Sequence, residues 1–185
     1  MLYHIAWFNE APVEPRLDGG LTSDSETVCR RCLLPARALE QLGLECSVFG
    51  NLADADPTQV NIHLQKLQCE IVVIGEFDTS SAIPLARAAK HLGCYVIADI
   101  DKESVASKDL VKLAEIVDHI VASSRDVATI IGQLTGHIAS IIPDCEERST
   151  GAHSPMAIAR LWLDDFKRLR LKPPVCANTN EPVRH

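Results

Sequence analysis

Long apolar runs are missing from this 185-residue sequence, and so is any extended run of basic residues. No stretch is apolar enough to cross a bilayer, which takes about 20 consecutive apolar residues. The formal net charge is −7, so we expect no broad binding to nucleic acid or to anionic membranes. The segment Met1–Ile5 lacks the basic start of a signal peptide and is expected to form a strand, which favours a cytoplasmic location.

Several ligand-binding motifs are also missing. There is no GxGxxG dinucleotide motif and no GxxxxGKS/T phosphate motif. Cys29 and Cys32 form a CxxC, but no second CxxC or HxxxH completes a zinc ligand set, and the order of elements is not that of thioredoxin. A redox or metal role stays open beside the favoured interpretation, in which both thiols lie on the first helix and one faces the core. We expect no metal and no cofactor.

Apolar segments of strand length alternate with segments of helical periodicity. The pattern predicts strands at 2–8, 46–49, 71–74, 95–98, 119–122 and 138–142, and helices at 28–42, 56–67, 80–92, 109–116 and 123–134. Such alternation implies right-handed βαβ crossovers and a parallel sheet covered on both faces. We therefore predict a single α/β domain with a doubly wound, Rossmann-like parallel sheet of about six strands in three layers.

The C-terminal part is expected to differ from this sheet domain, which spans residues 1–146. Residues 147–153 are polar and predict a linker, and Ser154 caps a helix over 154–172. An apolar stripe on that helix comprises Ile158, Leu161, Trp162, Phe166 and Leu169. The stripe must be buried on the sheet domain, on a twin chain or on a missing partner. Residues 173–185 are expected to be a mobile tail.

The loop after the first strand, residues 9–27, is long for a βα connection. In an open parallel sheet, ligands bind at the carboxyl ends of the strands, near the point where strand order reverses. The loop holds Gly19 and Gly20, then Thr22 and Ser23, just before a helix N-terminus, a pattern that favours anion binding. The alternative is a solvent-exposed flap whose glycines serve turn geometry.

Polar residues follow other predicted strands. Asp99 and Asp101 can act as a general base, bind a hydroxylated substrate or cap the next turn. Glu76 and Asp78 occupy the same place after the preceding strand, where capping of the next helix is the favoured role for Asp78. Ser123 follows a later strand. No Ser-His-Asp set emerges from the sequence.

Four stretches resemble the acceptor-side, N-terminal domain of GT-B glycosyltransferases of the family 4 type. Cys32–Cys46 resembles the family's LPARAL…GHEV run, and Ile83–Asp101 resembles ALARRLGIPVVVDIDD. Val117–Ser124 resembles ADRVIVSSE, and Ile141–Asp144 resembles the VIPNG that closes the acceptor domain. The order and spacing of these runs over residues 1–146 carry the resemblance.

The resemblance implies that the glycine loop faces the sugar acceptor and the phosphates of a nucleotide sugar, with the carboxylates near an inter-domain cleft. The predicted site residues are Asp99 and Asp101 for catalysis, and Gly19, Gly20, Thr22, Ser23, Glu76 and Ser123 for substrate or phosphate binding.

The second domain of that family, which holds the nucleotide sugar, has no counterpart after Pro143. A half-site does not easily align a donor with an acceptor. The prediction is therefore a glycosyltransferase-like acceptor domain, a part or subunit completed by a donor-domain partner chain. The alternative is a non-catalytic interaction or oligomerisation module that uses the Trp162 stripe. A response-regulator-like phosphate binder is disfavoured, because no lysine follows the last strand.

Overall fold

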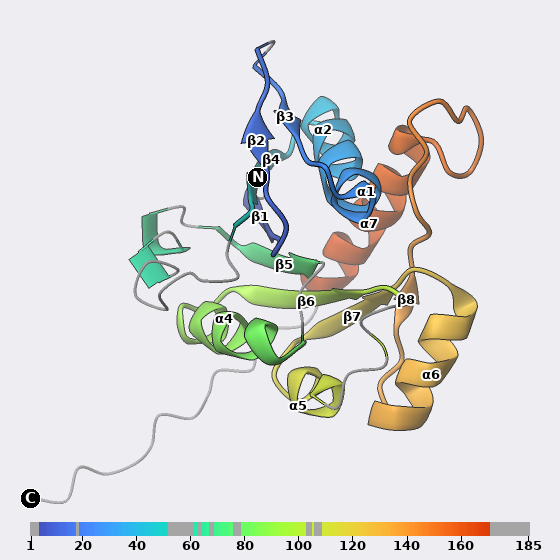
Figure 1. The fold of residues 1–185 in the computed structure, drawn as a ribbon. Coiled ribbons are helices and arrows are strands. Elements are labelled where there is room, and N and C mark those ends of the chain that lie inside the picture. Colours follow the sequence, from blue (N-terminus) through green and yellow to red (C-terminus); the bar gives the residue numbers. More distant parts are fainter. Residues whose placement is uncertain are drawn as a thin grey trace, which may run out of the picture.

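A sheet of six parallel strands forms the centre of the molecule, between two layers of helices (Figure 1). The computed structural model describes residues 4–17, 19–51, 61–62, 64–66, 69–75, 79–102, 105 and 109–170. The strand order is β4-β1-β5-β6-β7-β8, and every neighbouring pair is parallel. The predicted three-layer, Rossmann-like α/β fold is therefore confirmed.

The strands lie close to their predicted positions. They are β1 (His4–Phe8), β4 (Glu45–Phe49), β5 (Ile71–Gly75), β6 (Tyr95–Ile100), β7 (His119–Ala122) and β8 (Ser140–Ile141). Every residue of β5 is buried, as its apolar sequence predicts for a central strand with both faces covered. From β1 the chain forms β4 on one side and β5 on the other, so strand order reverses between β1 and β5.

The helices are α1 (Glu26–Val28), η1 (Cys29–Leu33), α2 (Leu34–Gln41), α4 (Thr79–His91), α5 (Leu110–Ala114), α6 (Arg125–Thr135) and α7 (Pro155–Arg170). The first three are continuous, with η1 as a π-helical segment between two α-helical ones. Gly43 and Gly93 end α2 and α4 with φ of 86° and 82°, as predicted. Pro84 lies inside α4, which starts at Thr79, one residue before its predicted start. The predicted helix 56–67 lies largely outside the described residues.

Hydrophobic residues fill both faces of the sheet. One face packs against α4, α5 and α6, and the other packs against η1, α2 and α7 (Figure 1). On the second face, Trp7 of β1 meets Trp162 and Phe166 of α7 edge-on, with ring centroids 5.7 and 6.4 Å apart. Aromatic pairs in this geometry stabilise beyond the area that they bury. The C-terminal helix is therefore an integral part of the sheet domain.

This packing corrects two predictions about α7. Trp162 is 1% exposed and packs on the sheet of its own chain, which is the first of the three predicted alternatives and rules out Trp162 as a contact with a second chain. Leu161, on the same predicted apolar stripe, is 41% exposed, because the buried face is centred on Ile158, Trp162 and Phe166. The side chain of Leu169 lies outside the described residues.

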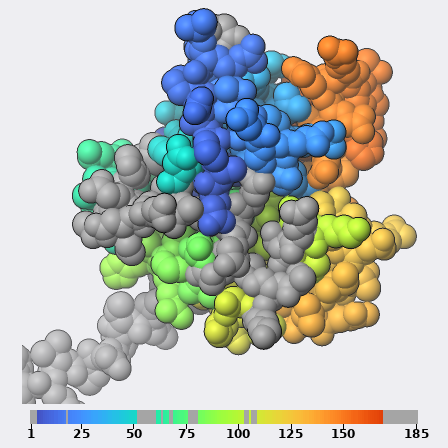
Figure 2. Space-filling view, in the orientation of Figure 1, coloured from blue at the N-terminus to red at the C-terminus, as the bar shows by residue number. Residues whose placement is uncertain are grey.

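The loop after β1 has more regular structure than the sequence pattern predicts. It contains a hairpin of two short antiparallel strands, β2 (Glu14–Pro15) and β3 (Leu21–Thr22). Gly19 has a φ of 81° at the turn, and the Arg16 N–H donates to the Gly20 carbonyl at 2.7 Å. The hairpin projects at the top of the molecule in Figure 2. Strands of two residues give no alternation in the sequence, so the pattern does not reveal them.

Candidate functional site

Residues from three central strands, two of them polar, meet at the carboxyl edge of the sheet, the edge where the parallel strands end. Asn9 directly follows β1 and is 1% exposed. Asp99 lies inside β6, which runs two residues further than predicted, and it pairs in register with Gly75 of β5. A Cβ placed on Gly75 would lie 3.2 Å from Asn9 Oδ1 and 4.0 Å from Asp99 Oδ2. The three residues therefore converge where strand order reverses.

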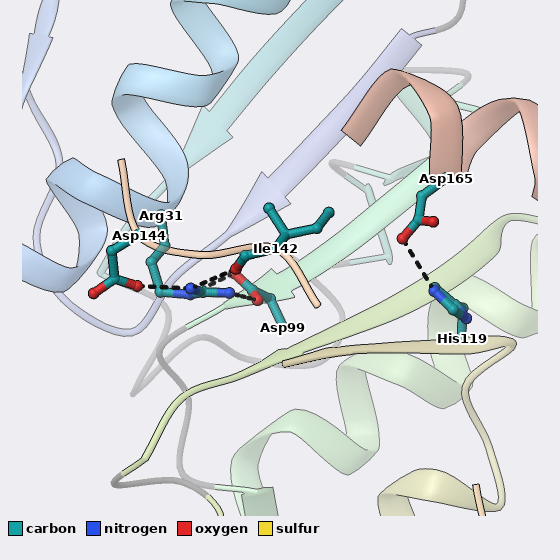
Figure 3. A network of polar contacts seen from close by, with 6 residues as sticks. All are labelled: Arg31, Asp99, His119, Ile142, Asp144 and Asp165. Atoms are coloured by element: carbon teal, nitrogen blue, oxygen red, sulfur yellow. Dashed lines mark hydrogen bonds and ion pairs between the residues drawn. The ribbon is translucent and has the colours of Figure 1, made fainter. Parts of the chain in front are cut away.

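Arg31 of η1 is buried above this edge, with 7% exposure. Its Nε donates to Asp99 Oδ2 at 3.1 Å, and its Nη2 donates to Asp99 Oδ1. Its Nη1 donates to the Ile142 carbonyl at 3.1 Å and to Asp144 Oδ1 at 2.7 Å. Figure 3 shows how the guanidinium joins the helix, β6 and the segment after β8. We call Arg31, Asp99, Ile142 and Asp144 the Arg31 clamp.

Within the clamp, Arg31 and Asp99 form an ion pair buried inside the protein, whereas the Asp144 side chain is 48% exposed. Burial raises the pKa of Asp99, and the charge and hydrogen bonds of Arg31 oppose that shift. Burial also acts to lower the pKa of Arg31, but Asp99 and Asp144 outweigh it and raise that pKa. We take the pair as charged, because arginine is not deprotonated in proteins and its fork fits both carboxylate oxygens.

The pairing with Arg31 bears on the predicted role of Asp99 as a general base. Both oxygens of Asp99 accept hydrogen bonds from Arg31, whereas a general base must direct an oxygen at its substrate. Asp101 follows β6 and is half-buried. Ser123 follows β7 and is half-buried, and its N–H donates to the Ile100 carbonyl at 3.1 Å. Asp101 and Ser123 are thus the predicted site residues beside Asp99 at this edge, while Glu76 and Asp78 lie outside the described residues.

The CxxC pair borders the same edge. Cys32 is 2% exposed, and Asn9 Nδ2 donates to its Sγ at 3.4 Å. Burial raises the pKa of the Cys32 thiol well above its ordinary value. Cys29 is half-buried, and its thiol donates to the Ser23 carbonyl at 3.3 Å. One thiol of the pair therefore faces the core, as predicted.

The predicted glycines lie at a different place. A cavity of about 190 Å³ separates the β2–β3 hairpin from α2 and β4. Its lining consists of Gly19, Gly20, Leu21, Leu33, Ala36, Arg37, Glu40, Cys46 and Val48. Arg37 Nη2 donates to the Leu21 carbonyl across it, and burial raises the pKa of Glu40 while Arg37 opposes the shift. We call this the hairpin cavity. Asp99 and Asp101 do not line it, so the predicted glycines and carboxylates do not share one pocket.

The remaining polar residues of the predicted phosphate loop form hydrogen bonds within the loop and at the start of the following helix. Ser23 Oγ donates to the Pro12 carbonyl at 2.6 Å and accepts from the Ser25 N–H at 3.2 Å. Ser25 in turn caps α1 by accepting from the Val28 N–H at 3.2 Å. Thr22 is exposed on β3. These contacts fix the hairpin against the start of the helix.

A second polar cluster lies at the opposite, amino edge of the sheet, and the sequence did not reveal it. His119 Nε2 lies 3.0 Å from Ser140 Oγ and 3.2 Å from Asp165 Oδ2 (Figure 3 shows His119 and Asp165). Ser140 Oγ also donates to Asp165 Oδ1 at 3.1 Å. In a hydrolytic triad the carboxylate and the serine contact different ring nitrogens, so this triangle instead ties α7 to β7 and β8. The signal in the sequence that could have revealed this cluster is Asp165, an aspartate on the apolar face of α7.

Two properties hold for the described residues as a whole. None of the helices they form combines the length and the apolar character needed to span a membrane. They contain no group of three or more His, Cys, Asp and Glu side chains placed to hold a metal ion.

Comparison with known proteins leaves the family open. No protein-family model and no curated protein matches the chain. Anabaena Alr3699/HepE, solved in complex with UDP and glucose, matches with a TM-score of 0.49 and 13% identity over 78% of this chain and 45% of that chain. The chain therefore spans less than half the length of HepE.

Two further solved structures match at a similar level. The sugar isomerase domain of the RpiR transcription factor from Sphaerobacter thermophilus has a TM-score of 0.43 and 13% identity over 91% of this chain and 72% of its own. A de novo designed Rossmann 2x3 protein has a TM-score of 0.41 and 9% identity, with 90% and 91% covered. These likenesses are too weak to support a functional argument, and the fold assignment rests on the observed sheet topology.

Proposed function

We propose that this chain is a glycosyltransferase-like acceptor-side domain that binds a sugar acceptor or a nucleotide sugar at the carboxyl edge of its sheet. The observation that carries the proposal is the convergence of Asn9, Gly75 and Asp99 at the point where strand order reverses. Open parallel sheets bind their ligands at this point. Glycine at position 75 matters, because a Cβ there would crowd the Asn9 side chain. The sequence resemblance over residues 1–146 supports the choice of ligand class.

In this proposal the residues at the edge have different roles. Asp99 is a positioning residue, because Arg31 engages both of its oxygens. Asp101 and Ser123 are the groups that contact hydroxyls of the ligand. The hairpin cavity, with Gly19, Gly20 and the cation of Arg37, is the alternative place for a phosphate group. A donor-domain partner chain completes the enzyme.

The runner-up is a non-catalytic interaction module with the same fold. It is favoured by one observation: the buried carboxylate at the carboxyl edge is neutralised by an arginine of its own chain. Such a module would bind neither nucleotide sugars nor sugar acceptors. Its contact surface would not include Ile158, Trp162 or Phe166 of the Trp162 stripe, because these three side chains are buried.

Isothermal titration of the full chain against a panel of UDP-sugars, GDP-sugars and simple sugar acceptors tests the proposal. Each titration is run with and without a candidate donor-domain partner. Asp101→Ala and Ser123→Ala are expected to weaken binding, and Arg37→Ala in the hairpin cavity is the matched control. Weakening by Arg37→Ala alone would move the site to the hairpin. No binding under any condition would favour the non-catalytic module.

A further inference from the structure

Two cysteines lie together at the amino edge of the sheet, outside the Arg31 clamp and the hairpin cavity. Cys69 comes shortly before β5, and Cys94 directly precedes the neighbouring strand β6. Their Sγ atoms are 4.0 Å apart, although the residues are separated by 25 positions in the sequence. Both are largely buried, with 7% and 6% exposure. Only the fold brings these two thiols into contact.

We propose that Cys69 and Cys94 form a modification site, a dithiol that hydrogen peroxide converts into an intramolecular disulfide. A disulfide joins cysteines whose Cα atoms lie about 5.5–6 Å apart, and neighbouring strands lie about 4.8 Å apart. Strand pairing continues up to the thiols, since the Tyr95 N–H donates to the Glu70 carbonyl at 2.9 Å. In the register that pairs Ile71 with Tyr95, Cys94 lies opposite Glu70, one residue from Cys69, and we expect the bond to close mainly by rotation of the two side chains.

The surroundings of Cys69 and Cys94 differ, and so do the expected reactivities of their thiols. A hydrogen bond from Cys69 and the nearby charge of Lys90 lower the pKa of Cys94, in spite of its burial. The same hydrogen bond, together with burial, raises the pKa of Cys69. Either thiol can donate in the hydrogen bond between them, so we assign Cys94 as the thiolate that reacts first because the charge of Lys90 acts on it, and Cys69 as the thiol that resolves the intermediate.

The reaction balances with one molecule of peroxide. The Cys94 thiolate attacks an oxygen of hydrogen peroxide, the O–O bond breaks, hydroxide leaves and Cys94 becomes a sulfenic acid. The Cys69 sulfur then attacks the Cys94 sulfur and displaces its hydroxyl, which leaves as water with the proton of Cys69. The hydroxide takes up the proton that Cys94 lost on ionising, so two thiols lose two electrons in total and the peroxide is reduced to two waters.

The CxxC motif draws attention to Cys29 and Cys32, but in the structure these thiols form hydrogen bonds with other residues and not with each other. Cys29 donates to the Ser23 carbonyl and Cys32 accepts from Asn9, whereas the carbonyl to which Cys94 donates at 3.3 Å belongs to Cys69 itself and keeps the two cysteines together. Among the cysteines that the structure describes, Cys69 and Cys94 are the pair whose sulfurs are in hydrogen-bond contact. We therefore expect oxidation to select a pair that no sequence motif marks.

Peptide mapping of the intact chain tests this inference without reference to ligand binding. The reduced protein is treated with hydrogen peroxide, the remaining thiols are alkylated, and a tryptic digest is analysed by mass spectrometry. Cys69 falls in the peptide Leu67–Arg87 and Cys94 in His91–Lys102, each with a single cysteine. We expect a cross-linked product of these two peptides, lighter than their sum by two hydrogen atoms, and the loss of two thiols per chain.

The controls are single substitutions. Cys69→Ser is expected to leave Cys94 as a sulfenic acid that dimedone traps, and Cys94→Ser is expected to form no cross-link. Cys29→Ser should give the wild-type cross-link. Mapping of wild-type protein alone decides the matter if a variant fails to fold. A dominant cross-link between other cysteines, or peroxide treatment that leaves both peptides alkylated, would overturn the proposal.

Discussion

Replacing Arg31 by methionine gives the sharpest test of the clamp. Arg31→Met keeps a long side chain but removes its charge and its hydrogen-bond donors. Asp99, which is 5% exposed, is then an unpaired buried carboxylate. The substitution also removes the donor to the Ile142 carbonyl and to Asp144. Removing one partner of a buried ion pair costs about 3–5 kcal/mol. For a chain of this size, that loss corresponds to a fall of about 6–20 °C in melting temperature.

Urea unfolding followed by circular dichroism measures the loss, and the neighbouring arginine provides the control. Arg30 pairs with Glu26 on the helix surface, and its side chain is 44% exposed. Arg30→Met is therefore expected to change the free energy of unfolding by less than about 0.5 kcal/mol. In a double-mutant cycle with Asp99→Leu, the double variant should lose less than the sum of the single losses, by about 1 kcal/mol or more. An Arg31→Met loss no larger than that of Arg30→Met would refute the reasoning.

Further expectations concern the core, a helix cap and alkaline stability. Trp162→Ala should lower the free energy of unfolding by about 3–5 kcal/mol, while Leu161→Ala on the exposed side of α7 should cost far less; equal losses in urea unfolding would contradict the assigned packing. Ser124 accepts from the Val127 N–H at 3.3 Å at the start of α6, so Ser124→Ala should cost about 1 kcal/mol, and a neutral result would rule out the cap. Burial raises the pKa of Cys46 from 9.0 to about 12. The folded chain then keeps a proton that the unfolded chain releases, so stability should fall as pH rises from 9 towards 12. Cys46→Ala should make this fall shallower in a pH series of melting temperatures, and an unchanged slope would contradict it.

The sheet could be predicted from the sequence because its central strands are apolar on both faces. The run Ile71–Ile74 has no polar residue, which is typical of a buried parallel strand, and Gly43 and Gly93 mark helix ends. The hairpin was missed because β2 and β3 have two residues each and one of these four is Pro15. Segments that short have no periodicity to detect.

The sequence contains a hint of the clamp but does not identify its partners. Arg31 lies three residues after Val28 and four before Pro35, both of which are buried on the same helix. An arginine at helical spacing from apolar residues needs a carboxylate partner. The sequence does not identify the carboxylate that pairs with Arg31. In addition, η1 is a π-helical segment that buries Arg31, Cys32 and Leu33 in succession. No periodic pattern with 3.6 residues per turn predicts that arrangement.

The sequence also could not predict that the glycines and the carboxylates of the proposed site lie apart in the structure. Spacing along the chain placed the glycines and the carboxylates in loops that both follow strands. The hairpin instead carries Gly19 and Gly20 to α2 and β4, where they line a cavity with Arg37. The side of the sheet on which a long loop folds back depends on tertiary contacts such as the Arg37 hydrogen bond to Leu21. The sequence contains no local signal for such a contact.

The proposed function is tested most directly by following backbone amide signals of the full chain by NMR during titration with UDP-glucose and then with a sugar acceptor. We predict saturable shifts at Gly75, Asp99, Asp101 and Ser123, with little change at Gly19 and Gly20. An unchanged spectrum at the carboxyl edge, or shifts confined to the hairpin, would contradict the proposal.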